Sequence, residues 1–401
     1  MKVLGIIAEY NPFHNGHAYH IAKSKAITNS DYVVVIMSGS FTQSGNIAIY
    51  DKFSRANIAV SYGADLVIEL PTIYANSSSE YFAYGAINLL NNLNIIDFLS
   101  FGSESNDIGI LNNISNKLCE NEKYIWDDIK KELKKGTSFA KSRLNALTSF
   151  LTSDEISISS LSNNILAIQY LSTINKLSSN IKPILIKRLS SNFNDTTLNN
   201  SFFTSATSIR NAIINNELLT IKHYVPSETL TLINSKTPLD NSYLYDMLKY
   251  KILCLSKDKL KNINEVCEGL ENKLFDAISN SLNYDDFIMN LKSKRYQLSK
   301  IKRLIVNILL NITKTDFNLF NNSNLTYAHV IACNSKGKYL LSQISKKSDI
   351  LLITSINKTN IDNLKISKSL DLDILATNIY ATLNNEHLNQ DFTNRLNFKK
   401  Q

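Results

Sequence analysis

Residues 3–20 of this 401-residue chain read VLGIIAEYNPFHNGHAYH, and this stretch decides the expected fold. It opens with six consecutive apolar residues, 3–8, which form a run of strand length. It continues with three of the six histidines and one of the five prolines of the chain. A helical pattern then runs from about residue 16 to residue 27. A buried strand that leads into a helix is typical of a βαβ unit, whose ligands bind beyond the carboxyl end of the strand. We therefore expect a ligand site at residues 9–20.

The same alternation continues outward from this stretch. Further segments of strand length, rich in apolar residues, occur at residues 32–37, 65–70, 95–101 and 183–189. Helical patterns occur between them, at about residues 51–62, 79–93, 123–135 and 162–177. Continuous apolar runs of this length are typical of strands that are buried on both faces. The series predicts an α/β fold, a Rossmann-like doubly wound parallel sheet with right-handed crossovers.

The pattern changes after the segment TSATSIR at residues 204–210. Strands and helices alternate before this segment, and the pattern beyond it is mostly helical. One long amphipathic helix is expected near residues 296–312, where apolar residues recur at helical spacing: Leu298, Ile301, Ile305, Ile308 and Ile312. We predict a catalytic domain at residues 1–215 and a mostly helical, basic domain at residues 216–401.

The composition indicates a globular protein, since 44% of the residues are apolar. The run at residues 3–8 is short for a signal peptide, and no stretch approaches the roughly 18 apolar residues that a membrane span requires. We therefore expect a soluble cytoplasmic protein that does not bind a membrane; the sequence indicates no particular oligomeric state. The cysteines argue against a disulfide framework or a structural zinc site, because they lie far apart without a CxxC pair: Cys119, Cys254, Cys267 and Cys333.

The histidine cluster follows the first strand, where the N–H groups and the dipole of a helix N-terminus favour an anion. Gly16 permits close backbone approach, and His14 and His17 lie on the first helical turn. This combination predicts phosphate binding by donors that take up charge as a leaving group departs. Two other interpretations stay open. His14, His17 and His20 would form a metal site, against which stands the presence of only one nearby carboxylate, Glu9. A purely structural histidine pair would bind nothing.

A second anion site is expected at residues 205–210, which read SATSIR. Hydroxyl groups at a helix N-terminus together with an arginine form a phosphate clamp, although the same residues would serve an ordinary N-cap. The two elements resemble the HxGH signature and the ISxTxIR element of the nucleotidyltransferase superfamily, a superfamily that includes the class I aminoacyl-tRNA synthetases.

Longer segments narrow this resemblance. The chain resembles the bacterial tRNA(Met) cytidine acetate ligase family, strongly over residues 1–215 and more faintly beyond. The similar segments are AEYNPFHNGH at 8–17, MSGSFTQSGNIAIYDKFSRA at 37–56, GADLVIELP at 63–71, FGSE at 101–104, SNNILAIQY at 162–170, TSATSIR at 204–210 and LKSKRYQLSKIKRL at 291–304. The resemblance implies an ATP-dependent ligase that makes acetyl-adenylate and pyrophosphate from acetate and ATP. It would then acetylate the exocyclic amine of the wobble cytidine of elongator tRNA(Met).

The resemblance also implies the site residues. The residues expected to stabilise the transition state are His14, His17, Thr207 and Arg210. The first loop would line the ATP site with Ile7, Ala8, Glu9, Tyr10, Asn11, Pro12, Phe13, His14, Asn15, Gly16, His17, Ala18, Tyr19 and His20. Later segments would add Gly102, Asn163, Arg188, Ser205, Thr207 and Arg210. Magnesium is expected with the triphosphate, and no metal site built from protein residues alone is predicted.

Contacts to the tRNA are expected mainly from the second domain. Eleven basic residues between residues 287 and 348 stand against one acid, which makes a window of net charge +10 in a chain of net charge +8. Lys and Arg neutralise phosphates, and an aromatic ring offers a stacking surface. The residues assigned to substrate or tRNA are Lys52, Arg55, Lys292, Lys294, Arg295, Tyr296, Lys302 and Arg303. The chain departs from the family pattern at Ser44, where arginine is usual, and at residues 46–48, which replace a run with a proline.

Two other functions remain open. A small-molecule adenylyltransferase of the same superfamily would transfer adenylate without RNA, and an RNA-binding protein would carry a vestigial nucleotide site. The segment KISKS at residues 365–369 mimics the KMSKS loop of class I synthetases. Such a pentamer arises easily in a chain rich in Lys, Ser and Ile, and SATSIR already supplies the second phosphate clamp.

Overall fold

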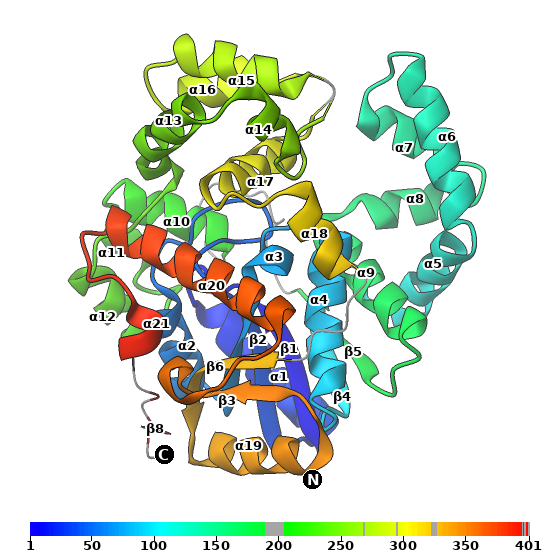
Figure 1. Ribbon diagram of the computed structural model, residues 1–401. Coiled ribbons are helices and arrows are strands. Elements are labelled where there is room, and N and C mark those ends of the chain that lie inside the picture. The colour runs from blue at the N-terminus through cyan, green and yellow to red at the C-terminus, as the bar shows by residue number, and fades with distance from the viewer. Residues whose placement is uncertain are drawn as a thin grey trace.

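The computed structural model describes residues 1–188, 204–267, 269–293, 296–321, 327–394, 396, 398 and 399. Its sheet has the strand order β5-β4-β1-β2-β3-β6-β7, with β8 paired to β6 (Figure 1). The strands are β1 (Val3–Ala8), β2 (Tyr32–Ser38), β3 (Leu66–Leu70), β4 (Phe98–Ser103), β5 (Lys182–Lys187), β6 (Tyr327–Asn334), β7 (Leu351–Ile353) and β8 (Phe398–Lys399). The neighbouring pairs from β5 to β3 are parallel, which confirms the predicted doubly wound α/β fold.

The central strands are mostly apolar because helices cover both faces of the sheet. Val34 and Ile36 of β2 belong to the core under α4 and α9, while Val33 and Val35 belong to the core under α1 and α2. Alternate residues of a strand point to opposite faces, so each face receives one set. The covering helices are α1 (Asn15–Thr28), α2 (Lys52–Ser61), α4 (Ser79–Asn92) and α9 (Ser162–Lys176), with the short α3 (Thr72–Ala75) before α4.

A helical arm lies between β4 and α9 and projects from the side of the sheet (Figure 1). It consists of α5 (Ile108–Glu120), α6 (Glu122–Lys134), α7 (Phe139–Leu147) and α8 (Ser153–Ser160). The helix predicted at residues 123–135 is α6. Its buried residues Ile125 and Ile129 lie one turn apart on the face that packs inward.

Helices also dominate the segment after β5. They are α10 (Ala206–Ile214), α11 (Leu218–Ile221), α12 (Ser227–Ser235), η1 (Asn241–Leu244), α13 (Tyr245–Cys254), α14 (Lys257–Asn262), α15 (Leu270–Ser279), α16 (Tyr284–Leu291), α17 (Leu298–Leu309) and α18 (Lys314–Asn321). The amphipathic helix expected near residues 296–312 is α17, which buries Ile301, Ile305 and Ile308. Among the helices of the described residues, none combines the length and the apolar character that crossing a bilayer requires.

The chain then returns to the sheet, which the pattern of residues 216–401 did not lead us to expect. Strand β6 pairs antiparallel with β3, with Leu66 opposite Cys333. The remaining elements are α19 (Ser335–Lys347), η2 (Ile356–Lys358), α20 (Leu364–Leu383) and α21 (Gln390–Thr393). Buried residues on both sides of residue 215 belong to one core. The division at residue 215 therefore stays a prediction, and the part beyond it is helical with added strands.

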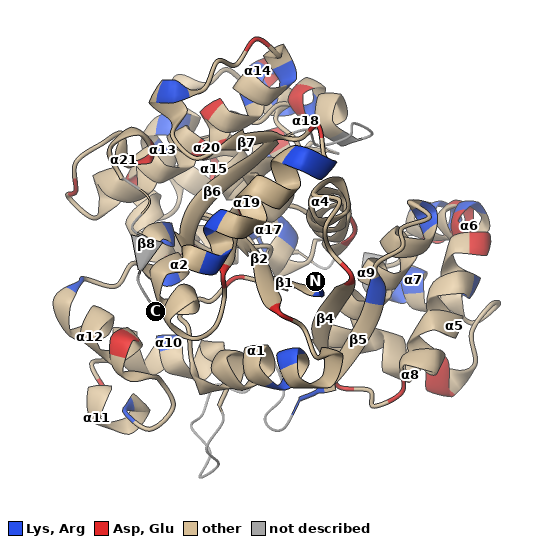
Figure 2. Ribbon diagram, turned by 90° about the horizontal axis from the view of Figure 1, so that it is seen from below, with Lys and Arg blue, Asp and Glu red and all other residues tan. Residues whose placement is uncertain are grey.

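The basic window at residues 287–348 does not form one surface. Because β6 is antiparallel to β3, it ends where β3 begins, and α19 starts at that edge of the sheet. Helix α17 lies at the opposite end, as Figure 1 shows. Figure 2, which views the molecule from below, shows blue segments on α19. The interpretation of this window as a single RNA-facing surface was therefore wrong, since four of its cations, Lys336, Lys338, Lys346 and Lys347, lie on α19.

Candidate active site

A cavity of about 1550 Å³ opens at the carboxyl ends of the central parallel strands. Its wall includes Ala8 at the end of β1, Gly102 at the end of β4 and Lys187 at the end of β5. It therefore lies where a doubly wound sheet binds its ligands. Most of the residues predicted for ATP line it: Ile7, Ala8, Glu9, Tyr10, Asn11, His14, Gly16, His17, Tyr19, His20, Gly102, Asn163, Arg188, Ser205, Thr207 and Arg210.

Four residues of the predicted loop, Pro12, Phe13, Asn15 and Ala18, do not belong to the cavity wall. The Phe13 side chain is fully buried, with its ring centroid 4.8 Å from that of Tyr10. The Asn15 amide donates a hydrogen bond of 2.8 Å to a backbone carbonyl of the segment after α11. These residues hold the loop in place from behind.

His14 and His17 are fixed by the start of α1. The Nδ1 of His14 accepts a hydrogen bond from the Gly16 N–H at 3.0 Å, and the Nδ1 of His17 accepts one from the His14 N–H at 3.2 Å. The two rings stack with centroids 3.7 Å apart. A neutral imidazole that accepts at Nδ1 carries its proton at Nε2. Each ring therefore keeps an Nε2–H donor for a ligand of the cavity.

Burial keeps these imidazoles neutral. It lowers the pKa of His14 to about 3, with Arg188 and Arg210 acting in the same direction. The pKa of His17 also falls well below its ordinary value, mainly through burial and then through His14. His20 lies in hydrogen-bond contact with the Ser100 hydroxyl at 2.9 Å, and burial lowers its pKa to about 4. At neutral pH the three rings therefore act as hydrogen-bonding groups and not as fixed cations.

The turn before α1 is held by contacts to distant segments. Tyr10 adopts a φ of +47°, a left-handed conformation that is uncommon for an aromatic residue and costs free energy. The side-chain oxygen of Asn11 accepts a hydrogen bond from the Ile49 N–H at 2.8 Å. The Asn11 carbonyl accepts one from Nη1 of Arg210 at 2.7 Å. The loop after β1 is thus positioned by two segments far along the chain.

The segment SATSIR forms the first turn of α10. The Ser205 hydroxyl caps the helix by accepting a hydrogen bond from the Ser208 N–H at 3.0 Å. Nη2 of Arg210 donates to the Thr207 hydroxyl at 2.9 Å. Burial lowers the pKa of Arg210, and Glu9 opposes this shift. The structure therefore brings the second predicted anion clamp to the cavity that holds the histidine pair.

Gly102, Asn163 and Arg188 meet at the start of α9. Nη1 of Arg188 donates to the side-chain oxygen of Asn163 at 3.3 Å. A Cβ on Gly102 would lie 3.5 Å from Cγ of Arg188, which is an ordinary contact. The protein itself therefore tolerates a side chain at residue 102, and the glycine leaves open space in the cavity.

Glu104 completes this corner and was missed as a site residue. Its carboxylate accepts hydrogen bonds from the Asn163 amide at 2.6 Å and from the Asn164 N–H at 3.0 Å, so it caps α9. Its place after the strand in the segment FGSE, before a helix that starts with SNN, was the available signal. A carboxylate is favoured at a helix N-terminus.

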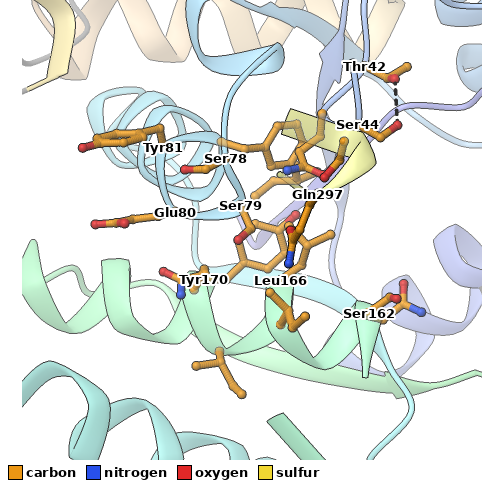
Figure 3. A pocket seen from close by; sticks show the side chains of 18 of the residues that line it. Thr42, Ser44, Ser78, Ser79, Glu80, Tyr81, Ser162, Leu166, Tyr170 and Gln297 are labelled. Atoms are coloured by element: carbon orange, nitrogen blue, oxygen red, sulfur yellow. Dashed lines mark hydrogen bonds between the residues drawn. The ribbon is translucent and has the colours of Figure 1, made fainter. Parts of the chain in front are cut away.

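The loop between β2 and α2 closes another side of the cavity. Glu9 accepts a hydrogen bond from the Gln43 N–H at 2.9 Å, and burial raises the pKa of Glu9. The Thr42 and Ser44 hydroxyls lie 3.4 Å apart (Figure 3). Asn46 donates to Ser44 at 2.7 Å and accepts from Nζ of Lys302 at 2.9 Å. The positions that depart from the family pattern thus bind each other and α17.

Lys52 and Arg55 are not exposed contacts for substrate or tRNA, and that prediction is corrected. The Lys52 side chain is 1% exposed, and its Nζ lies 2.7 Å from carboxylate oxygens of Glu69 and Asp391. The buried Arg55 guanidinium donates to backbone carbonyls of four residues: Glu9, Ser38, Gly39 and Tyr50. Both cations bind internal groups of the protein, and these contacts connect α2 to the ends of β1, β2 and β3.

The pair of carboxylates around Lys52 also satisfies the spacing of a metal site. One ligand atom each of Glu69, His329 and Asp391 lies within 4.8 Å of the others, and all three are buried. The Nδ1 of His329 is 2.9 Å from Glu69. However, the Lys52 ammonium already binds both carboxylates. A lysine cation therefore provides the positive charge that a metal would bring.

The basic residues predicted for tRNA have different surroundings. Lys292 is exposed, while Tyr296 is half-buried and lines the cavity. Arg303 is buried and pairs with Glu265 at 3.2 Å. Lys294 and Arg295 lie outside the described residues. The KISKS segment lies at the start of α20 and does not line the cavity.

Comparison with known proteins agrees with this arrangement. A family model described as HIGH Nucleotidyl Transferase matches residues 1–395. A curated Clostridium acetobutylicum protein named tRNA(Met) cytidine acetate ligase is 41% identical over 396 residues, which cover 96% of each chain. A Clostridium perfringens protein of the same name is 37% identical over 98% of each chain. This chain belongs to the tRNA(Met) cytidine acetate ligase family.

This member of the tRNA(Met) cytidine acetate ligase family is also similar to solved structures over its whole length. A crystal structure of Thermotoga maritima TmcAL in its apo form I has a TM-score of 0.93 and 31% identity, and covers 100% of both chains. A second structure of that protein, bound with alpha-thio ATP, has a TM-score of 0.91 and 30% identity with the same coverage. The nucleotidyltransferase type of fold that the resemblance implied is confirmed.

Proposed function

We propose that this chain uses ATP to activate acetate as acetyl-adenylate, with release of pyrophosphate, and then acetylates the wobble cytidine of elongator tRNA(Met). The names of relatives that are 37–41% identical over nearly the whole chain support this reaction. The Thermotoga maritima structure bound with alpha-thio ATP supports ATP as the activating nucleotide.

The observation that carries the proposal is the hydrogen-bonding state of the histidine pair. The Nδ1 atoms of His14 and His17 accept hydrogen bonds from backbone N–H groups, which leaves two Nε2–H donors at the start of α1. Thr207 and Arg210 line the same cavity and contact each other. Neutral donors beside a guanidinium and a helix N-terminus suit a phosphate chain whose negative charge grows during the reaction.

The first step is an in-line attack of an acetate oxygen on the α-phosphorus of ATP. The bond from the α-phosphorus to the oxygen that bridges the α- and β-phosphates breaks, and pyrophosphate leaves with the negative charge on that oxygen. His14, His17, Thr207 and Arg210 stabilise this charge. The cytidine amine then attacks the acetyl carbonyl, and AMP leaves. Catalysis is mainly positioning and electrostatic stabilisation, because no protein nucleophile is required.

Magnesium fits beside Glu9. Mg²⁺ is usually held by substrate phosphates with one or two carboxylates. Glu104 is used in capping α9, whereas the Oε2 atom of Glu9 has no hydrogen bond to another described residue. Glu9 would hold the ion together with the phosphates. The bound ion would supply charge neutralisation for the triphosphate.

The test is incubation of the purified protein with ATP, labelled acetate and total bacterial tRNA, followed by mass analysis of nucleosides. Labelled acetylcytidine is the expected product. ATP consumption without acetylcytidine would favour the small-molecule adenylyltransferase. ATP binding with no turnover would favour an RNA-binding protein with an inactive nucleotide site.

A variant separates the two halves of the reaction. His17→Ala removes one of the two donors, and we expect acetate-dependent adenylate formation to fall by a factor of about 10² or more. The affinity for tRNA should stay close to that of the wild type. An equal loss of adenylate formation and tRNA affinity would contradict the assigned role of His17.

A further inference from the structure

The cavity extends far beyond the residues predicted for ATP. It follows α9 from Asn163 in the first turn to Lys176 in the last turn. At 1.5 Å per residue these two positions are roughly 20 Å apart. In Figure 3, Ser162 of α9 and Glu80 of α4 lie on opposite sides of the pocket. A volume of about 1550 Å³ also exceeds the roughly 300–1,000 Å³ of an ordinary ligand pocket. The end away from Asn163 is therefore free for a second ligand.

Helix α6 turns one full face toward this second end. The residues of α6 that line the cavity recur at helical spacing along its whole length: Glu122, Ile125, Trp126, Ile129, Lys130, Leu133 and Lys134. Trp126 is 42% exposed although it is the single tryptophan of the chain. Lys130 and Lys134 follow it at intervals of four residues, so an aromatic ring and two cations form one row on the wall.

Lysines on the cavity side of α6 lack ion pairs within the described residues, whereas those on the other side have them. Lys131 pairs with Asp128 at 3.1 Å, and Lys135 follows the helix and pairs with Glu132 at 2.7 Å. Neither of these two lysines lines the cavity. Lys130 and Lys134 do line it, and within the described part of the chain neither has an ion pair. Lys130 and Lys134 thus present positive charge to a cavity that also contains the carboxylates of Glu80 and Glu122, and Glu122 pairs with Lys176 at 2.8 Å.

An arginine on α7 extends the row. Arg143 is half-buried, lines the same cavity and has no hydrogen bond or ion pair with another described residue. Its burial lowers its pKa, as expected of a desolvated cation without a counter-charge. The same cavity is lined by Tyr296, whose ring centroid lies 5.0 Å from Nζ of Lys300. Cations and aromatic rings of the arm and of the segment around Tyr296 thus line one cavity.

We propose that Trp126, Lys130, Lys134 and Arg143 form a binding surface for a single-stranded loop of the substrate RNA. The three cations contact backbone phosphates, and the tryptophan stacks on an unpaired base of the same loop. Figure 2 shows Lys and Arg on α6 and α7 of the arm. This assignment rests on the proposed function, because that function makes RNA the partner.

RNA fits these groups better than an acidic protein does. Recognition of single-stranded RNA combines aromatic stacking of bases with cations along the backbone. The surface is also part of the cavity that contains the predicted ATP site, so a loop bound there enters the same cavity as the histidine pair. An acidic peptide would use the cations but would have no base to place on Trp126.

The test measures tRNA binding at several salt concentrations without ATP or acetate. Lys130→Ala/Lys134→Ala is expected to weaken binding about tenfold at 0.1 M salt. The slope of log K against log salt should fall in magnitude by about 1.4, since each lost contact to a single strand removes about 0.7. The matched control, Lys131→Ala/Lys135→Ala, loses the same charge from α6 and its C-cap and should change binding by less than a factor of about two.

A second variant tests stacking. Trp126→Ala is expected to weaken binding about 5- to 100-fold with an unchanged salt slope, and Trp126→Phe should restore part of the loss. Equal effects of the two lysine pairs, or no effect of Trp126→Ala, would overturn the proposal. Displacement of tRNA by polyglutamate as effective as that by unlabelled RNA would overturn the assignment to RNA. Binding is measured without chemistry, so a wild type that binds through these residues but makes no acetylcytidine would refute only the proposed reaction.

Discussion

The imidazole rings of His14 and His17 stack with their centroids 3.7 Å apart and their planes inclined by 23°. Two imidazoles at this distance cannot both take up a second proton and become cations without strong repulsion. Burial lowers the pKa of His14 from its ordinary value of 6.5 to about 3. The unfolded chain therefore binds a proton at this residue below pH 6.5, whereas the folded chain excludes it until about pH 3. Burial of His14 therefore leaves the free energy of unfolding unaffected above pH 6.5 and lowers it progressively as the pH falls from 6.5 towards 3.

This relationship predicts the pH dependence of folding. Between pH 7 and pH 5 the free energy of unfolding should fall by about 2 kcal/mol on account of His14 alone. His14→Asn keeps an N-cap acceptor for Gly16 and removes the titrating ring. Urea unfolding of this variant at the two pH values should show a drop that is smaller than that of the wild type by this amount. The exposed His387 supplies the matched control, His387→Asn. An unaltered pH dependence in His14→Asn would contradict the prediction.

The buried ammonium of Lys52 predicts a large loss of stability on its removal. Lys52→Met leaves Glu69 and Asp391 without a counter-charge inside the protein. We expect the free energy of unfolding to fall by about 3–5 kcal/mol. Lys117→Met breaks the partly exposed pair of Lys117 with Glu155 and should cost less than about 1 kcal/mol. Urea unfolding at pH 7 measures both variants, and similar losses would show that burial of the Lys52 pair has no special weight.

Gly45 marks the closest approach of the β2–α2 loop to α17. Its φ is +76°, and a Cβ there would lie 2.2 Å from the backbone nitrogen of Arg303. Gly45→Ala must therefore push the loop away from α17, at a cost of about 3 kcal/mol.

Gly136 is the matched control for this substitution, because it has a φ of +82° and no heavy atom within 4 Å of a Cβ. Gly136→Ala should cost only about 1–2 kcal/mol through its backbone conformation. Thermal unfolding measures the difference. Equal costs would mean that the loop adapts without leaving α17.

Gly102 predicts an effect on ATP without an effect on folding. A Cβ there makes only an ordinary contact with Arg188. Gly102→Ala should leave the free energy of unfolding within about 1 kcal/mol of the wild type. It should raise the KM for ATP about tenfold, because the new methyl group occupies space in the cavity. Steady-state kinetics with varied ATP measure this value, and an unchanged KM would remove Gly102 from the ATP site.

The central sheet was predictable because its information is local. Each parallel strand is a run of consecutive apolar residues, and the helices between them begin and end within a few residues of the expected positions. The histidine pair was predictable for the same reason, since strand, turn and helix start are contiguous in residues 3–20. Glu104 shows the limit, because its role depends on Asn163 and Asn164 of a helix far along the chain.

Long-range pairing decided the rest. Lys52 and Arg55 lie one turn apart and have the sequence pattern of an exposed basic face. Only folding brings Asp391 to Lys52 and the backbone carbonyl groups to Arg55, so that both cations are bound inside the protein. The antiparallel strand β6 likewise separates the cations of α17 from those of α19, which are close in sequence.

The sequence by itself determined the alternation of strands and helices, the place of the ligand site at the end of β1, and the residue types that suit a phosphate chain. These follow from hydrophobic periodicity and from local turn and helix-start chemistry, which act over a few neighbouring residues. The tertiary structure alone decided which cations face the cavity and which are neutralised inside the protein. Whether a cation is neutralised depends on the groups that surround it in space, and these groups come from segments that are distant in the sequence.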